Sequence, residues 1–247
     1  MKAPIVVMNF THVYEEERFG RDRSFEWIDC TDLRGTDCYC DEEALQTLRR
    51  RMAPYPAEGI HFIDSGNYHY LTKLWTDKIR EPFSLIVFDH HPDMQPTLFG
   101  GMLSCGSWVK VMLDENPFLR KVCVVGVADK LVKAVPATYR ERVRFYAETS
   151  LSHEESWQRF SHDHVDEPIY ISIDKDVLDT ASASTNWDQG SLSLADLEKL
   201  LEIILQKEKV IGVDVCGECT LSPNLLEDER DLAMDRLANK ALLAQFL

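Results

Sequence analysis

The sequence is poor in basic residues and has no long apolar run. Of its 247 residues, 27 are Lys or Arg and 42 are Asp or Glu, so the formal net charge is −15 at pH 7. A chain this acidic lacks the basic face that nucleic acids and anionic membranes require, and we expect neither as its main partner. It also lacks a run of about 18 apolar residues, which argues against a membrane-spanning helix.

The first ten residues lack the features of a secretion signal. They contain one basic residue, Lys2, followed by an apolar stretch too short for a signal peptide, and we interpret them as leading into a first strand. The seven cysteines are an odd number in a chain without such a signal. We therefore expect reduced thiols and a cytoplasmic location.

Short apolar runs recur along the chain, and most are continuously apolar, which is typical of strands buried on both faces of a parallel sheet. Segments with helical spacing lie between them, most clearly 193–206, where Ser193 and Asp196 resemble a capping box. Weaker helical patterns cover 42–52, 70–79, 107–113, 152–160 and 228–246. The predicted strands are 5–10, 25–28, 60–63, 85–88, 122–127, 143–146, 169–173 and 210–215.

Strands that alternate with helices predict right-handed crossovers and a sheet covered on both faces. We therefore expect an α/β fold, a three-layer α/β/α sandwich around a mostly parallel sheet of roughly eight strands. No internal repeat or Pro/Gly/Ser-rich linker divides the chain, so we expect a single domain spanning 1–247. In such sheets ligands bind beyond the carboxyl ends of the strands, which directs attention to the polar residues there.

Two strand ends carry acidic and imidazole side chains at alternate positions. Asp89, His91 and Asp93 follow the run 85–88, and Asp174 and Asp176 follow the run 169–173. Residues two apart in an extended chain point the same way, so each array projects to one side. Four carboxylates in close contact cannot all stay ionised without cations among them. Two divalent cations would balance them, and such oxygen-rich donors suit Mn²⁺ better than the thiolate sites that favour zinc.

A further ligand is expected from the segment after the run 60–63. The turn at 65–67 could aim His69 toward the carboxylates, and Asp64 is the competing donor. His90 should point away from His91 and take a supporting role. A single Asp or His at such a position usually has a structural role, but two period-two arrays at one sheet edge favour a metal site. Two metals that share a water are typical of hydrolases.

These motifs resemble those of the arginase–agmatinase (ureohydrolase) family over roughly residues 60–246. The Asp-x-His-x-Asp motif of that family corresponds to 89–93, and its Ser-x-Asp-x-Asp-x-x-Asp motif corresponds to 172–179. The resemblance implies a binuclear manganese centre whose bridging hydroxide is the nucleophile, with Asp93 accepting a hydrogen bond from it. One Mn²⁺ ion would then be bound by His69, Asp89, Asp93 and Asp174. The other would be bound by Asp89, His91, Asp174 and Asp176.

Two departures from the family pattern concern the substrate. The family has a substrate-binding Glu three residues after an Asp of the last strand, and counting from Asp214 places Gly217 there. Glu218, one residue later, could take that part if the loop bulges, and we expect it to orient a cationic nitrogen group. The family's proton-shuttling His has no counterpart, and Trp108 is the nearest residue in sequence.

We therefore expect a manganese-dependent hydrolase that acts on a linear C–N bond of a guanidine, an amidine or an amide. Its partner would be a small molecule that could carry positive charge. Family members often form oligomers, so the resemblance also implies a homo-oligomer. The family resemblance supports the metal chemistry more strongly than any specificity for guanidinium.

Three other interpretations are open. The run 89–91, Asp-His-His after an apolar strand, also matches DHH-type manganese phosphoesterases, although no Asp-x-Asp pair lies near the N-terminus. The metal cluster could also lack catalytic activity, since the shuttle His is missing. Finally, Cys38 and Cys40 could join Cys216 and Cys219 in a four-thiolate zinc site, but ordinary turn cysteines are the favoured interpretation.

Overall fold

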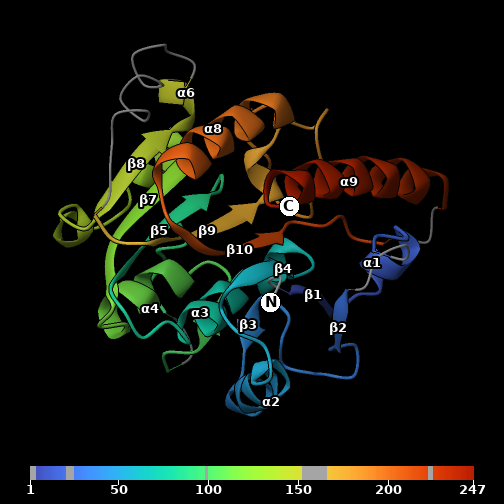
Figure 1. The fold of residues 1–247 in the computed structure, drawn as a ribbon, viewed down its shortest axis with the longest axis horizontal. Helices are drawn as coiled ribbons and strands as arrows, with labels where there is room; N and C mark the ends of the chain where they lie inside the picture. Colours follow the sequence, from blue (N-terminus) through green and yellow to red (C-terminus); the bar gives the residue numbers. More distant parts are fainter. Residues whose placement is uncertain (1–3, 21–24, 98–99, 152–165, 222–224) are drawn as a thin grey trace.

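The computed structural model of the protein describes residues 4–20, 25–97, 100–151, 166–221 and 225–247. Its centre is an eight-stranded parallel sheet with the order β2-β1-β4-β10-β9-β5-β7-β8 (Figure 1). These strands are β1 (Ile5–Asn9), β2 (Glu26–Asp29), β4 (Gly59–Phe62), β5 (Phe83–Phe88), β7 (Leu119–Val127), β8 (Val143–Ala147), β9 (Ile169–Asp174) and β10 (Val210–Cys216). A separate antiparallel pair joins β3 (Tyr39–Cys40) to β6 (Leu103–Ser104).

Helices cover both faces of the sheet and complete three layers (Figure 1). One face is packed by α2 (Glu42–Met52), α3 (Leu71–Thr76) and α4 (Trp108–Glu115). The other is packed by α1 (Val13–Glu16), α8 (Leu194–Lys207) and α9 (Leu225–Gln245). Shorter helical segments are η1 (Gly66–Tyr68), α5 (Asp129–Val132), η2 (Ala137–Tyr139), α6 (Glu148–Leu151) and η3 (Lys175–Val177). The predicted α/β/α sandwich is confirmed.

The strand and helix predictions agree with this arrangement. Each predicted apolar run overlaps one of the sheet strands. The inner strands β4, β5 and β9 are buried on both faces and so are mostly apolar, whereas the edge strand β2 is largely exposed. At the start of α8, the Ser193 hydroxyl accepts a hydrogen bond from the Asp196 backbone N–H at 3.1 Å, as the predicted cap requires. The predicted helix 152–160 lies outside the described residues.

Four neighbouring strands in the middle of the sheet, β4, β10, β9 and β5, bring their carboxyl ends to one edge. In this register Cys216 is paired with Asp174, and Phe88 is paired with Ile173, so Asp89 follows beside Asp174. The polar residues at these four ends therefore meet. None of the helices in the described part of the chain has the length and apolar character needed to cross a bilayer.

Candidate metal centre

His69 lies among three carboxylates at this edge of the sheet. The ring follows η1, the turn after β4, and its Nδ1 is 3.2 Å from Asp89 Oδ2 and 3.1 Å from Asp93 Oδ2. The same nitrogen is 3.4 Å from Asp174 Oδ2. All four side chains are buried. The structure thus brings a predicted imidazole and three predicted carboxylates together at one point.

Asp64, the competing donor, does not belong to this group. Its carboxylate accepts hydrogen bonds from the backbone N–H groups of Phe10 (2.8 Å), Thr11 (3.0 Å) and Ser65 (2.8 Å). The Thr11 hydroxyl donates a further bond at 2.8 Å. Asp64 therefore joins the loop after β1 to the loop after β4, and His69 is the residue of this segment that faces the carboxylates.

His91 occupies the second half of the site. Its Nδ1 is 2.8 Å from Asp176 Oδ2 and 3.5 Å from Asp89 Oδ1. Asp89 therefore presents one oxygen to His69 and the other to His91, and it spans the two halves. Asp174 and Asp176 are linked as well, because Asp174 Oδ1 accepts the Asp176 backbone N–H at 3.0 Å.

Hydrogen bonds at the outer nitrogens determine which way the rings present their lone pairs. His69 Nε2 is 2.9 Å from the Ser172 hydroxyl, which donates its own proton to Asp214 at 2.6 Å and so accepts from the ring. His91 Nε2 is 3.0 Å from a carboxylate oxygen of Asp188. Both rings thus place N–H on Nε2 and turn Nδ1 toward the carboxylates. Metal-binding histidines are held in this way in proteins.

The charges at this site are unbalanced without cations. Burial, reinforced by Asp176, raises the pKa of Asp174 to about 7. Burial, reinforced by Asp89, raises the pKa of Asp176 to about 6. Asp89 Oδ2 is buried and has no hydrogen-bond donor among the described residues. Carboxylates that cannot all ionise, together with an unpartnered oxygen, fit a site for divalent cations.

The histidines respond to the same charges. Burial disfavours the protonated form of His91, yet the carboxylates of Asp176 and Asp89 outweigh it and raise the pKa to about 12. For His69 burial again opposes protonation, but Cys216, Asp89 and Asp93 together raise its pKa well above the ordinary value. Each imidazole is therefore held where a positive charge is favourable. A bound cation satisfies the same requirement.

The two histidines and four carboxylates of the candidate metal centre line a cavity of about 380 Å³. Trp187 is 40% exposed, and its Nε1 donates to Asn67 at 2.9 Å. Trp108 is fully buried, and its Nε1 donates to Asp93 Oδ2 at 2.5 Å. The indole that stands nearest the family's shuttle position is thus a fixed hydrogen-bond donor to Asp93. Apolar cavity walls come from Met94, Pro96, Leu131, Val135 and Pro136.

The structure does not place Glu218 in this cavity. Beyond Cys216 the chain turns at Gly217, whose φ is +92°, and the Glu218 carboxylate comes to 2.7 Å from Lys175 Nζ. Asn239 donates to the same carboxylate at 3.0 Å. A substrate in the cavity does not meet this group, so the predicted role of Glu218 in orienting a cationic nitrogen is not supported. We name this buried group the Lys175 cluster: Glu17, Lys175, Glu218, Asp235 and Asn239.

Sequence reasoning placed Ser172 in a family motif without a role and did not find Asp188. Ser172 lies two residues before Asp174 on the same strand, so alternation could have indicated its role, whereas Asp188 lies in a loop with no such signal. The cysteine pairs do not form the four-thiolate site. Cys216 contacts Asp174, while the Cys219 backbone N–H is donated to Asp235.

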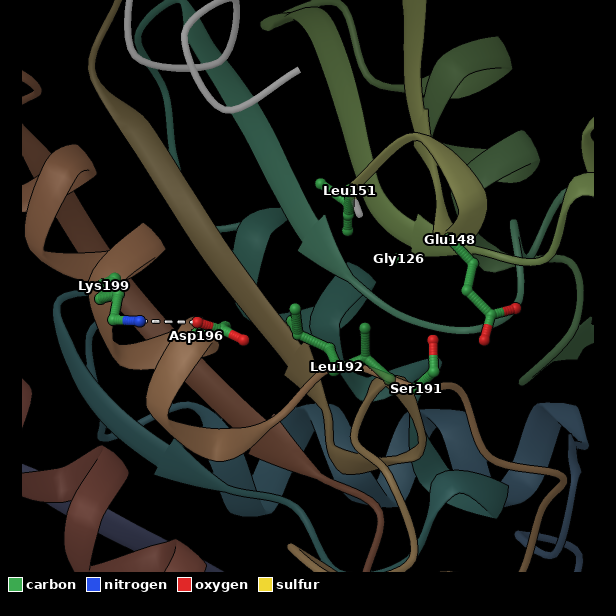
Figure 2. Close-up of a pocket in the computed structure, with 8 residues that line it drawn as sticks. Gly126, Glu148, Leu151, Ser191, Leu192, Asp196 and Lys199 are labelled. Carbon is green, nitrogen blue, oxygen red and sulfur yellow. Dashed lines mark hydrogen bonds and ion pairs between the residues drawn. The ribbon is translucent and has the colours of Figure 1, made fainter. Parts of the chain in front are cut away.

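A second cavity, of about 420 Å³, is lined by a different set of residues (Figure 2). Glu148 and Ser191 lie on one side of it, and the ion pair between Lys199 and Asp196 lies on the α8 side. His90 Nδ1 is 4.0 Å from Glu148, and its ring is perpendicular to that of His91. His90 thus turns away from the candidate metal centre, as predicted.

The fold and the donor set define an α/β protein with a buried carboxylate–imidazole site at the carboxyl edge of a parallel sheet. The chain belongs to the arginase family, whose sequence model matches residues 6–244. An uncharacterized protein of Thermotoga maritima is 32% identical over 216 residues, which cover 87% of this chain and 79% of that protein. This membership confirms the predicted family and favours it over the phosphoesterase alternative.

Solved structures show the same fold. The proclavaminate amidino hydrolase of Streptomyces clavuligerus superposes with a TM-score of 0.71 at 17% identity. The aligned residues cover 98% of this chain and 90% of that protein. The formimidoylglutamase of Bacillus subtilis gives a TM-score of 0.66 at 17% identity, with 98% and 85% coverage. At these identities the likeness concerns the fold alone.

Proposed function

We propose that the protein is a metal-dependent hydrolase that binds two divalent cations and cleaves a linear C–N bond. One observation supports this most strongly. Two histidines turn Nδ1 toward a shared set of carboxylates, while Nε2 of each is hydrogen bonded to a supporting residue. In the absence of a cation, burial would disfavour this concentration of negative charge.

The residues divide into two overlapping sets. One cation would be held by His69, Asp89, Asp93 and Asp174. The other would be held by Asp89, His91, Asp174 and Asp176. The oxygen-rich donors suit Mn²⁺, the metal implied by the family resemblance. Such cations, when bound, supply a water of lowered pKa and stabilise negative charge that develops on the substrate.

The chain itself contributes positioning and proton handling. The Trp108 N–H fixes the Asp93 carboxylate, and we assign Asp93 as the acceptor of a hydrogen bond from the attacking water. Ser172 and Asp214 hold the His69 ring, and Asp188 holds the His91 ring. These supports keep both imidazoles oriented before substrate enters, which lowers the reorganisation that the reaction needs.

The cavity also bears on the substrate. The acidic residues that line it are the four proposed ligands, Asp89, Asp93, Asp174 and Asp176. No further carboxylate in the described lining is left to pair with a guanidinium group. We therefore favour substrates with a neutral reacting group, an amide foremost, over guanidines. The apolar walls would contact the remainder of such a molecule.

A second candidate, metal binding without catalysis, is favoured by one observation. Trp108 is fully buried beside Asp93, and an indole N–H cannot take up a proton as a shuttle histidine would. The proposed hydrolase would then rely on the cations and Asp93 for proton transfer.

The test has two stages. The purified protein is stripped with a chelator, reloaded with Mn²⁺ and analysed for metal by mass spectrometry, with two ions per chain expected. Release of ammonia or urea is then measured on a panel of amides, amidines and guanidines, and an amide should be the best substrate. Two bound ions with no turnover on the whole panel would favour the non-catalytic candidate. Failure to bind any divalent cation would contradict both.

A further inference from the structure

Cys216 brings a sulfur atom into one half of the candidate metal centre. It is the last residue of β10 and is paired in register with Asp174 at the end of β9. Its Sγ is 3.2 Å from Asp174 Oδ2, and the side chain is fully buried. The ligand atoms of His69, Asp174 and Cys216 all lie within 4.8 Å of one another.

The neighbouring groups leave room for an ion at this sulfur. The thiol donates its proton to Asp174 Oδ2, the oxygen that also lies 3.4 Å from His69 Nδ1. Asp89 Oδ2 is 3.2 Å from the same nitrogen, is buried, and has no hydrogen-bond donor in the described part of the chain. A cation at Nδ1 would take the place of the thiol proton at Asp174 Oδ2 and would satisfy the unpartnered oxygen of Asp89.

The backbone after Cys216 keeps other side chains out of this space. Gly217 has a φ of +92°, and a Cβ at this position would lie 2.4 Å from Asp174 Oδ1. A residue with a side chain would therefore collide with the carboxylate. The tight turn allows β10 to end with its thiol against Asp174. The half of the site around His91, Asp89 and Asp176 has only nitrogen and oxygen donors among its described residues.

We propose that Cys216 binds, as a thiolate, the cation that is held by His69 and Asp174. The thiol proton is released to solvent when the sulfur–metal bond forms, with no change of oxidation state. Sulfur, nitrogen and oxygen donors together select a thiophilic cation such as Zn²⁺ or Co²⁺, whereas the other half keeps the preference for Mn²⁺. The two halves of the centre thus differ in metal preference. This inference rests on the proposed function and specifies the metals that it uses.

Cobalt reports on this sulfur directly. The metal-free protein is titrated with Co²⁺, and a thiolate–cobalt charge-transfer band in the near ultraviolet is expected with the first equivalent. Cys216→Ser should abolish the band and should weaken binding of Zn²⁺ relative to Mn²⁺ by about tenfold or more, the scale on which residues around a metal change its affinity. Cys38→Ser is the matched control, because Cys38 lines the same cavity outside this group, and it should keep the band.

A second measurement uses the unaltered protein and does not depend on how the variants fold. X-ray absorption of the zinc-loaded wild-type chain should show one sulfur neighbour at about 2.3 Å. Wild-type protein that binds cobalt and zinc without a charge-transfer band and without a sulfur neighbour would overturn this inference and leave the proposed metal centre intact. Wild-type protein that binds no divalent cation would overturn the proposed function as well.

Discussion

Two buried groups of carboxylates lie at the same edge of the sheet, and they balance their charge in opposite ways. In the Lys175 cluster an ammonium group is 2.7 Å from Glu218 and 3.5 Å from Asp235. In the candidate metal centre, carboxylates surround two imidazoles, and the described residues in contact with them include no Lys or Arg. One group carries its own ammonium counter-ion, and the other has two imidazoles for four carboxylates and requires further positive charge from solution.

Among the acids of the Lys175 cluster, Glu218 shows the effect of the ammonium group, whereas burial raises the pKa of Asp235 to about 6 and that of Glu17 well above its ordinary value. Burial opposes ionisation of Glu218, yet Lys175 keeps its pKa below the ordinary value. Asp174, equally buried and surrounded by further acids, has its pKa raised to about 7. Burial alone therefore does not distinguish a structural group from a binding site. A contacting ammonium group separates Glu218 from Asp174, and the predictions below test that distinction.

The largest effect is expected from removing the built-in cation. Lys175→Met leaves Glu218 and Asp235 buried without their counter-ion, and the free energy of unfolding should fall by about 3–5 kcal/mol. Added divalent cations should not restore it. Denaturant titration measures the change. Lys199→Met, which removes an exposed lysine from a surface ion pair, is the control and should cost less than about 1 kcal/mol. A comparably small loss for Lys175→Met would contradict the comparison.

The second effect concerns metal affinity. Asp174→Asn removes a carboxylate from both proposed ligand sets, and the affinity for divalent cations should fall by more than about 100-fold together with any hydrolase activity. Without metal, this variant should have a melting temperature at least as high as that of the wild type, because a buried acid has been removed. Asp235→Asn is the matched control from the Lys175 cluster, and its metal content should not change. Retention of two ions by Asp174→Asn would show that the ligand assignment is wrong.

The third effect is a pH dependence that metal should remove. The pKa values of Asp174 and Asp176 are raised in the folded chain to about 7 and about 6, and that of His91 to about 12, so the folded state holds protons that the unfolded state has lost. Stability of the metal-free protein is therefore present at low pH and declines as pH rises through these values, by about 1.4 kcal/mol per pH unit for each extra proton.

His61 acts in the opposite direction at lower pH, because burial lowers its pKa to about 3. The comparison is therefore made between pH 6.5 and pH 8, with thermal unfolding followed in a chelator and in excess Mn²⁺. The melting temperature should fall over this range in the chelator, and it should stay level or rise with metal, whose binding displaces protons. A rise in the metal-free protein would be inconsistent with the raised pKa values.

The smallest effect is expected at Trp108. Trp108→Phe removes the N–H donated to Asp93 but retains most of the buried aromatic volume. Metal content should stay at two ions per chain, with affinity changed by less than about tenfold, while turnover should fall because the Asp93 carboxylate is no longer fixed. Metal analysis and steady-state kinetics measure the two quantities. Loss of an ion would mean that the indole is needed to form the site itself.

The strands were the most predictable part of the molecule. Runs such as 85–88 are apolar at every position, because both faces of the sheet are covered, and this pattern is hard to confuse with an amphipathic helix. The two-residue strands β3 and β6 were not predicted, since so short a pair leaves no periodic signal.

The site was predictable where two donors follow the same strand end at alternate positions, although only Asp174 lies within a strand and Asp176 lies in η3. Asp174 and Asp176, two residues apart, face the same group, and so do Asp89 and His91. Glu218 could not be placed in this way, because its direction depends on the turn at Gly217 and on an ammonium group contributed by another strand end. Contacts that join distant segments through a non-extended backbone leave no period in the sequence.

The order Asp174, Lys175, Asp176 runs from the end of β9 into η3, and it also affects how this strand can pair with its neighbours. If the chain slipped by a single residue along this path, Lys175 would take the place of Asp174 or Asp176 at the candidate metal centre, and an acid would take the place of Lys175 beside Glu218 and Asp235. The first change removes a proposed ligand from the candidate metal centre, and the second sets like charges against each other in a dry interior. Electrostatics thus opposes a shift in the register of β9 that the apolar part of the strand alone would tolerate.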